Sequence, residues 1–189
     1  MKIVGIAGSP RRLGNSDTML STFLEEISSE NSSQLIIPSQ LNIHFCQGCR
    51  YCEVMGKCAI EDDAAKVFST LLEANLVIVS SPVFFYGFPA CLKALIDRSQ
   101  VLWSRRHLLG EIFPKKAGFL LVCGATKGKK LFDGVRLTTR YFFDSFNCEY
   151  QGEILLRGLD KKGDLNLHPD YLTAIRAKAR FFLTGEVGG

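Results

Sequence analysis

The sequence has no long apolar run, little net charge and only three histidines, and each shortage excludes something. No stretch approaches the ~18–20 apolar residues of a membrane helix, and the short run at 3–7 precedes its arginines, unlike a signal peptide. A net charge of +4 is too weak to indicate nucleic-acid binding. The histidines are isolated, so no catalytic base stands out. We therefore expect a cytoplasmic protein that binds neither membrane nor nucleic acid.

Two familiar nucleotide-binding motifs are also missing. A P-loop requires G-x-x-x-x-G-K-[ST], but five residues separate Gly8 from Gly14, and Asn15 stands where the lysine is needed. The dinucleotide fingerprint G-x-G-x-x-G is absent as well, because Pro10 interrupts its spacing. The sequence therefore excludes both of these nucleotide sites.

The apolar pattern alternates between strands and helices along the 189 residues, 47% of which are hydrophobic. We expect strands at 3–7, 34–37, 75–80, 116–123 and 148–156. We expect helices at about 15–28, 90–105, 132–146 and 171–183, and one more that is opened by the acidic residues Glu61, Asp62 and Asp63. Such alternation predicts one α/β domain with a parallel sheet and helices on both faces. Ligands of such sheets lie at the carboxyl ends of the strands, where three loops fall here: 8–16, 81–88 and 124–128.

The first loop, GSPRRLGNS, joins a strand to a helix N-terminus and is rich in hydroxyl and backbone N–H groups. A helix N-terminus favours an anion, so this loop can hold one terminal phosphate. The candidate ligands are Ser9, Asn15 and Ser16, with Arg11 or Arg12 adding a charge-assisted bond. A plain helix capped by Asn15 or Ser16 is the alternative.

The second loop is apolar and aromatic, and it consists of Pro82, Val83, Phe84, Phe85 and Tyr86. A flat heteroaromatic ring suits such a wall, because aromatic faces stack and backbone N–H groups satisfy ring heteroatoms. Core packing of some of these aromatics is the alternative. A ring together with a single phosphate describes flavin mononucleotide, FMN.

Four of the seven cysteines form C-x2-C-x2-C-x5-C, at Cys46, Cys49, Cys52 and Cys58. Four thiolates at this spacing can wrap an iron–sulfur cluster, although bacterial ferredoxins use a shorter last gap followed by proline. Zinc and free or disulfide-forming thiols are the alternatives. The other three cysteines lie in apolar contexts and are interpreted as small core residues: Cys91, Cys123 and Cys148.

The motifs GSPRRLGNS and SSPVFFYGFPACLKALIDR resemble those of the NAD(P)H-dependent FMN reductase and iron–sulfur flavoprotein group, over roughly residues 1–125. The resemblance implies a flavodoxin-like three-layer sandwich, with a five-stranded parallel sheet of order 2-1-3-4-5. It implies one domain over residues 1–189, with a cysteine-rich insertion at about 43–60. By the same resemblance, the FMN phosphate lies on Ser9, Arg11, Asn15 and Ser16, the flavin ring lies on Pro82, Val83, Phe84, Phe85 and Tyr86 and is edged by Gly124, and a 4Fe-4S cluster is held by Cys46, Cys49, Cys52 and Cys58.

Three functions follow from these motifs. The first is an electron-transfer flavoprotein with FMN and a 4Fe-4S cluster, served by a ferredoxin-like carrier or NAD(P)H. The second is an NAD(P)H-dependent FMN or quinone reductase without a working cluster. The third is a zinc-stabilised binding module on the same scaffold. The resemblance also implies a homo-oligomer, a dimer or tetramer.

Overall fold

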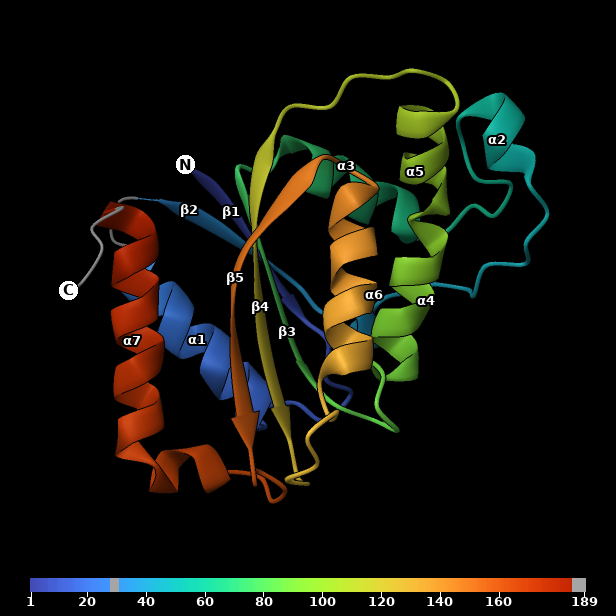
Figure 1. The fold of residues 1–189 in the computed structure, drawn as a ribbon. Coiled ribbons are helices and arrows are strands. Elements are labelled where there is room, and N and C mark those ends of the chain that lie inside the picture. The colour runs from blue at the N-terminus through green and yellow to red at the C-terminus, as the bar shows by residue number, and fades with distance from the viewer. Residues whose placement is uncertain (28–30, 185–189) are drawn as a thin grey trace.

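The sheet has five parallel strands in the order β2-β1-β3-β4-β5 (Figure 1). The computed structural model describes residues 1–27 and 31–184. The strands are β1 (Lys2–Ala7), β2 (Ser32–Ile36), β3 (Leu76–Pro82), β4 (Lys116–Gly124) and β5 (Cys148–Arg157). This confirms the predicted fold class and strand order, and every predicted strand lies within two residues of its expected bounds.

Burial explains which strands occupy the centre of the sheet. β1, β3 and β4 are buried on both faces, as their continuous apolar runs predict. β2 exposes most of its residues, and only two residues of β5 are fully buried, which suits the two edges of the sheet. The register pairs Ala7 with Ser80 and Pro82 with Cys123, so the carboxyl ends of the three central strands lie together.

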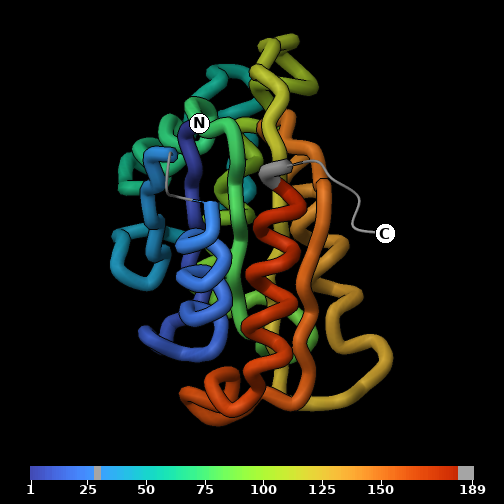
Figure 2. The backbone as a smooth tube through the Cα atoms, turned by 90° about the vertical axis from the view of Figure 1, so that its left-hand side faces the viewer, coloured from blue at the N-terminus to red at the C-terminus, as the bar shows by residue number. Residues whose placement is uncertain are grey.

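Helices cover both faces of the sheet. They are α1 (Asn15–Ile27), α2 (Tyr51–Met55), α3 (Ala64–Glu73), α4 (Ala90–Arg98), α5 (Gln100–His107), α6 (Asp133–Asp144) and α7 (Pro169–Thr184), with short 3-10 turns η1 (Pro38–Gln40) and η2 (Asp164–Leu167). One core lies under α1 and α7, which run side by side (Figure 2), and the other lies under α3, α4, α5 and α6. Within the described ranges, no helix has both the length and the apolarity needed to cross a bilayer.

The predicted helix at 90–105 is wrong in detail, because the structure divides it into α4 and α5 at Ser99. The Ser99 hydroxyl donates to the Ile96 carbonyl at 2.6 Å, and the Ser99 N–H is shared between the carbonyls of Leu95 and Ile96. A serine bonded to its own backbone competes with regular helix hydrogen bonding. Trp103 of α5 is only half-buried.

Two helix starts also differ from the prediction. Gly14 accepts the first helical bond from the Thr18 N–H, so Asn15 begins α1 and does not cap it. The acidic residues expected to open α3 instead precede it, and the Asp62 carboxylate accepts the Ala64 N–H. The expected end of α1 near Ser28 lies outside the described residues.

Candidate functional site

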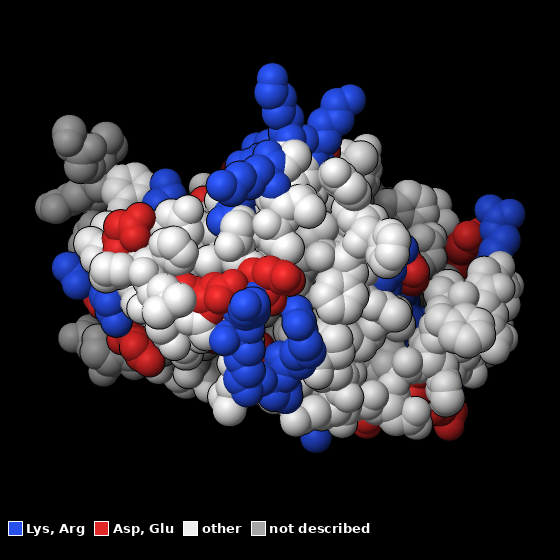
Figure 3. All heavy atoms as spheres, turned by 90° about the horizontal axis from the view of Figure 1, so that it is seen from below, with Lys and Arg blue, Asp and Glu red and all other residues white. Residues whose placement is uncertain are grey.

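The three candidate loops meet at the carboxyl edge of the sheet. The first follows β1, the second follows β3 and the third follows β4, and these strands are neighbours. The strand order reverses between β1 and β3, where open α/β sheets bind their ligands. Viewed from this end, the surface gathers Lys and Arg side chains in groups, one beside an acidic strip (Figure 3). The sequence therefore placed the three loops correctly at one edge.

The first loop is held tightly against the sheet. The Gly8 N–H donates to the Ser80 carbonyl at 2.7 Å, and a Cβ at Gly8 would lie 2.4 Å from Leu92 Cδ2. Ser9 is buried, and its hydroxyl oxygen accepts the Arg11 N–H at 3.1 Å. The first-turn N–H groups of α1 have no intrahelical acceptor by helix geometry, so they are available for an anion.

The two arginines of this loop differ in a way that the sequence did not show. Arg12 forms an ion pair with Asp17 at 2.8 Å, and Asp17 also accepts the Leu13 N–H. Arg11 is exposed, and its side chain makes no hydrogen bond or ion pair with any residue that the structure describes. Arg11 is therefore the arginine available for a ligand.

Asn15 uses its amide within the protein. Its Nδ2 donates to the Lys161 carbonyl at 2.9 Å, and its Oδ1 accepts the Leu165 N–H at 3.1 Å. These bonds tie the start of α1 to the segment after β5, a contact that sequence reasoning missed. Only one Nδ2 hydrogen is left for a phosphate. Ser16 is buried and its carbonyl accepts the Ser80 hydroxyl at 2.7 Å.

The second loop forms a tight aromatic turn. Phe84 and Gly87 exchange two backbone hydrogen bonds of 2.9 Å, and the central residues Phe85 and Tyr86 have φ values of 47° and 60°. Aromatic residues rarely adopt this left-handed region. Their side chains are exposed, Phe85 fully so, while Pro82 and Val83 are half-buried. The alternative of core packing is therefore wrong for the three aromatic side chains at positions 84–86.

The third loop and α6 support this turn. A Cβ at Gly134 would lie 2.4 Å from the Tyr86 carbonyl oxygen, and one at Gly128 would lie 3.3 Å from the Tyr86 hydroxyl. Gly124 is buried, where a Cβ would lie 2.9 Å from Leu131 Cδ2. Glycine is thus needed at position 134 for the close approach of helix and turn.

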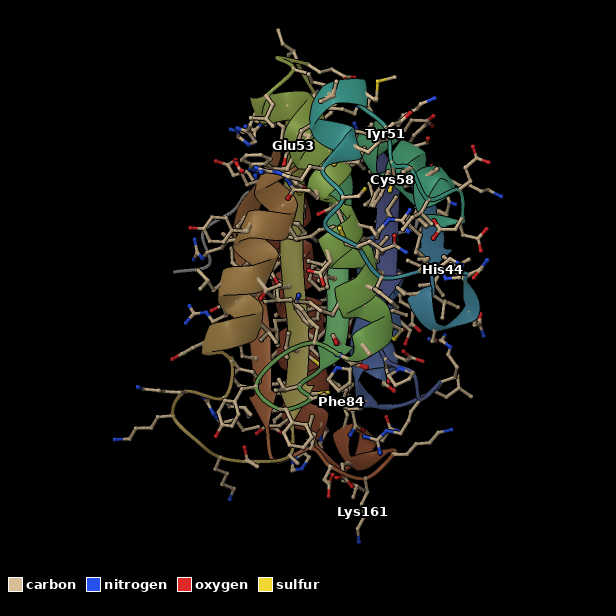
Figure 4. All side chains as sticks on the ribbon, turned by 90° about the vertical axis from the view of Figure 1, so that its right-hand side faces the viewer. His44, Tyr51, Glu53, Cys58, Phe84 and Lys161 are labelled. Carbon is tan, nitrogen blue, oxygen red and sulfur yellow. The ribbon has the colours of Figure 1, made fainter. Side chains whose placement is uncertain are left out.

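The cysteine loop, residues 43–60, lies away from this edge. Figure 4 shows Cys58 at a different level along the strands from Phe84, next to the short helix that carries Tyr51 and Glu53. Gly48 and Gly56 have φ values of 65° and 63°, so the loop needs them for its tight turns. The structure adds α2, which the sequence did not predict and which packs on α5.

All four cysteines of this loop line one cavity of about 360 Å³. They are half-buried except for Cys49, which is exposed, and Cys52 accepts a hydrogen bond of 3.6 Å from the buried Ser104 hydroxyl. Within the described part of the chain, no three of these side chains are already gathered as metal ligands, and the seven cysteines form no disulfide. The four cysteines therefore share one cavity, but their sulfur atoms are not gathered closely enough to form a ready metal site.

A buried ion pair lies beneath this cavity, and its role was missed in the sequence. Arg98 lines the cavity, and its guanidinium binds both carboxylate oxygens of Asp62, at 2.6 and 3.0 Å. Both side chains are almost completely buried. Burial disfavours the carboxylate, but bonds from Arg98 and two backbone N–H groups outweigh it and lower the Asp62 pKa. The sequence did contain a signal, because the acidic run 61–63 begins three residues after Cys58.

The remaining cysteines are mostly core residues, as predicted. Burial raises the pKa of Cys123 and of Cys148 to about 12, so both thiols stay protonated at neutral pH. Cys91 is only half-buried, and its Sγ lies 3.6 Å from the Gly8 carbonyl, so its assignment to the core is wrong. Cys91 instead packs against the backbone of the first loop at Gly8.

A family profile described as NADPH-dependent FMN reductase matches residues 1–133. The chain belongs to the NADPH-dependent FMN reductase family. The match covers all three loops and the cysteine loop, so the resemblance inferred from the motifs is confirmed. The description of this family names the reduction of FMN.

Curated relatives in this FMN reductase family carry iron–sulfur names. An iron–sulfur flavoprotein of Methanocaldococcus jannaschii is 35% identical over 128 residues, which is 67% of this chain and 64% of that protein. An iron–sulfur flavoprotein of Archaeoglobus fulgidus is 37% identical over 114 residues, 59% of this chain and 51% of that protein. The matches thus span less than two thirds of either relative's length.

Solved structures support the fold of the FMN reductase family. An NAD(P)H:quinone oxidoreductase from Methanothermobacter marburgensis superposes with a TM-score of 0.68 at 16% identity, covering all of this chain and 98% of that one. At this identity the likeness shows the flavodoxin-like fold alone.

Proposed function

We propose that the chain is an FMN-binding oxidoreductase that uses NAD(P)H or a small electron carrier. One observation carries this proposal: a loop that leads into a helix N-terminus and carries a free arginine, and an exposed aromatic turn, lie at adjacent strand ends. When bound, FMN accepts a hydride from NAD(P)H or single electrons from a carrier. The protein's task is to hold and orient the flavin, and no side chain at this edge is required as an acid or base.

The first loop would hold the phosphate. Arg11 supplies a charge, Ser16 supplies a hydroxyl group, and Asn15 supplies its remaining amide hydrogen. The Ser9 hydroxyl donates to the Arg11 carbonyl at 3.0 Å and would turn from it to reach the phosphate. The exposed lysines of the third loop, Lys127, Lys129 and Lys130, add a positive field that attracts anionic nicotinamide cofactors.

The second loop would hold the flavin ring. Phe84, Phe85 and Tyr86 offer exposed aromatic faces, and Pro82 and Val83 complete an apolar wall. Gly124 edges the same space from β4. The strained φ values of the turn suit a preorganised ligand contact, because strain of this kind concentrates at functional sites.

The cysteine loop would hold a 4Fe-4S cluster on Cys46, Cys49, Cys52 and Cys58. Three features fit an anionic cluster: four thiols around one cavity, a buried arginine on its wall, and a Ser104 hydroxyl directed at Cys52. The iron–sulfur names of the relatives point the same way. Such a cluster would pass single electrons to or from the flavin.

A reductase of FMN or quinones without a working cluster is the second candidate. It is favoured by the open arrangement of the cysteines, since no ready set of three metal ligands occurs within residues 1–27 and 31–184. The homo-oligomer, the ferredoxin-like carrier and the cytoplasmic location stay predictions, as does a single domain over residues 1–189.

Substitution of Arg11 tests the flavin site. Loss of a charge-assisted bond of about 1.5–3 kcal/mol should weaken FMN binding by about 10- to 150-fold in Arg11→Ala, measured by quenching of flavin fluorescence. Arg12→Ala is the matched control and should bind FMN nearly as wild type, because Arg12 is paired with Asp17. Riboflavin, which lacks the phosphate, should bind all three proteins equally. Equal FMN affinity in both variants would contradict the assigned phosphate loop.

Anaerobic analysis of iron, sulfide, zinc and flavin decides between the candidates. About four iron and four sulfide per chain together with FMN supports the cluster. FMN without iron, with rapid NAD(P)H oxidation, supports the second candidate. Zinc without flavin would contradict both and favour a structural metal module.

A further inference from the structure

Arg98 and Asp62 hold the two ends of the cysteine loop together at His44 and Ile60, a place that we call the neck of the loop. Arg98 Nη1 donates to the His44 carbonyl at 3.0 Å, before the first cysteine, and Nη2 donates to the Ile60 carbonyl at 3.1 Å, after the last. Asp62 Oδ2 accepts the His44 N–H at 2.9 Å. One buried ion pair thus binds both ends of the segment that carries the four thiols.

A second pair of contacts narrows the same neck. Asp63 Oδ2 accepts the Asn42 N–H at 2.7 Å, and the Asp63 N–H donates to the Asn42 carbonyl at 3.1 Å. The ends of the loop are therefore fixed to each other and, through Arg98, to α4. Inside the loop, α2 packs on α5, and the Ser104 hydroxyl of α5 donates to Cys52.

Arg98 has one donor that the neck does not use. Its Nε is buried and has no hydrogen-bond partner among the residues that the structure describes. The guanidinium lines the cysteine cavity, and the Cys58 sulfur is near enough to interact with it electrostatically. A buried N–H left unpaired costs free energy, so its presence here calls for an acceptor that the loop brings close when its thiolates are gathered.

We propose that Arg98 is a positioning residue for the metal centre of the cysteine loop: it fixes the loop neck through Asp62 and presents Nε–H and a positive charge to the thiolate side of the cavity. This rests on the proposed cluster. Reduction adds one electron, and so one negative charge, to the cluster. A fixed cation and an N–H donor on the wall of the cavity would stabilise the reduced state of such a cluster and raise its reduction potential.

Two variants distinguish the effect of the Arg98 hydrogen bonds at the neck from the effect of its positive charge. Arg98→Lys keeps the charge but cannot donate to two carbonyls and a carboxylate at once. The double variant Arg98→Met with Asp62→Leu removes both charges without leaving one unpaired, which buried pairs tolerate best. Arg180→Lys is the matched control, because Arg180 also binds a carboxylate, that of Glu26, on the opposite face of the sheet.

The first measurement is hydrogen exchange of residues 43–60 in the metal-free full chain. We expect faster exchange in both Arg98 variants and no change in Arg180→Lys. Unchanged exchange in folded Arg98 variants would overturn the role of Arg98 at the neck. This measurement needs no cluster, so it is independent of the proposed function.

The second measurement follows anaerobic reconstitution with ferrous iron and sulfide. We expect Arg98→Lys to lose about 10- to 100-fold in metal affinity, and the double variant to show a lower midpoint potential in a dithionite titration followed by EPR. Wild-type potential and iron content in both variants would overturn the proposal. A wild type that binds FMN but no iron would overturn the cluster and the electrostatic role of Arg98, while FMN binding by the first loop would stand.

Discussion

At the scale of single residues, the structure distinguishes side chains that the sequence presents as equivalent. Arg11 and Arg12 are neighbours, yet only Arg12 is held by an acid. Likewise, of the adjacent Asp62 and Asp63, only Asp62 meets a buried arginine. The difference lies in long-range contacts: Asp62 and Arg98 are 36 residues apart. No local pattern in the sequence specifies such a pair.

The buried Asp62 should make the protein sensitive to acid. Its pKa is lower in the folded state than the ordinary value of 3.8, so its stabilising contribution is complete above about pH 4 and is lost as the pH falls through the folded pKa. Between pH 5 and pH 2, the free energy of unfolding should fall more steeply in wild type than in Asp62→Asn. Urea unfolding at stepped pH measures this.

Two controls accompany this experiment. Asp62→Asn leaves Arg98 unpaired and should cost about 3–5 kcal/mol at pH 7. Glu73→Gln removes the acid of an exposed pair with Lys2 and should change little at any pH. Parallel pH curves for wild type and Asp62→Asn would show that the carboxylate is not charged in the folded protein.

At the scale of elements, the aromatic turn after β3 has a backbone conformation that lowers the stability of the folded protein. Phe85 and Tyr86 adopt left-handed φ values, yet Phe85 buries none of its side chain. Such strain costs of order 1–3 kcal/mol per residue. The packing of Gly134 against the Tyr86 carbonyl helps to hold the turn in this form. A ring stacked on the turn would explain why the aromatic side chains are there.

The variant Phe85→Asn should therefore change the stability of the protein and its affinity for FMN in opposite directions. Phe85→Asn should raise the unfolding free energy of the FMN-free protein by about 1 kcal/mol, because asparagine tolerates the left-handed region. It should also weaken FMN binding by about 2- to 12-fold, since aromatic stacking contributes about 0.5–1.5 kcal/mol. Urea unfolding and flavin titration measure the two effects.

Arg50→Asn is the matched control for this variant. Arg50 has a φ of 60° in the cysteine loop, away from the aromatic turn. The substitution should relieve strain in the same way without changing FMN affinity. If Phe85→Asn binds FMN as tightly as wild type, the turn does not stack on the flavin.

At the scale of the whole molecule, the two candidate centres occupy different parts of one α/β sandwich. The three candidate loops lie at the carboxyl ends of β1, β3 and β4, while the cysteine loop lies beside α4 and α5 (Figure 4). The first of these loops is joined to the last third of the chain through Asn15. Ligand binding at that edge should therefore stabilise the fold as a unit.

FMN should raise the melting temperature of the metal-free protein. At free FMN 100 times its Kd, linkage predicts about 2.7 kcal/mol, which corresponds to about 5–11 °C for a chain of this size. Differential scanning fluorimetry over an FMN series measures the shift. Riboflavin should give a smaller shift because it does not engage the phosphate loop. A melting temperature that is independent of FMN would contradict a flavin site at the strand ends.

The sequence alone determined the fold class, the strand order implied by its family and the three loops at one edge. The fold class and the loops follow from local periodicity and from glycine and proline punctuation, which act over a few residues, whereas the strand order was implied only by the family resemblance. It failed at Ser99, where a side chain bonded to its own backbone interrupts a helical pattern. It also failed at Cys91, whose helical context does not reveal its exposure.

Only the tertiary structure decided which arginine is free, where the Asn15 amide is bonded, and that Arg98 closes the cysteine loop. Each of these depends on groups distant in sequence and close in space, such as Asn15 and Leu165, 150 residues apart. Hydrogen bonds and ion pairs act over a few ångströms, so their partners are fixed only once the strands and helices have packed. The local apolar pattern of the sequence determined the helices and strands. Their packing determined which side chains are free to bind a ligand at each site.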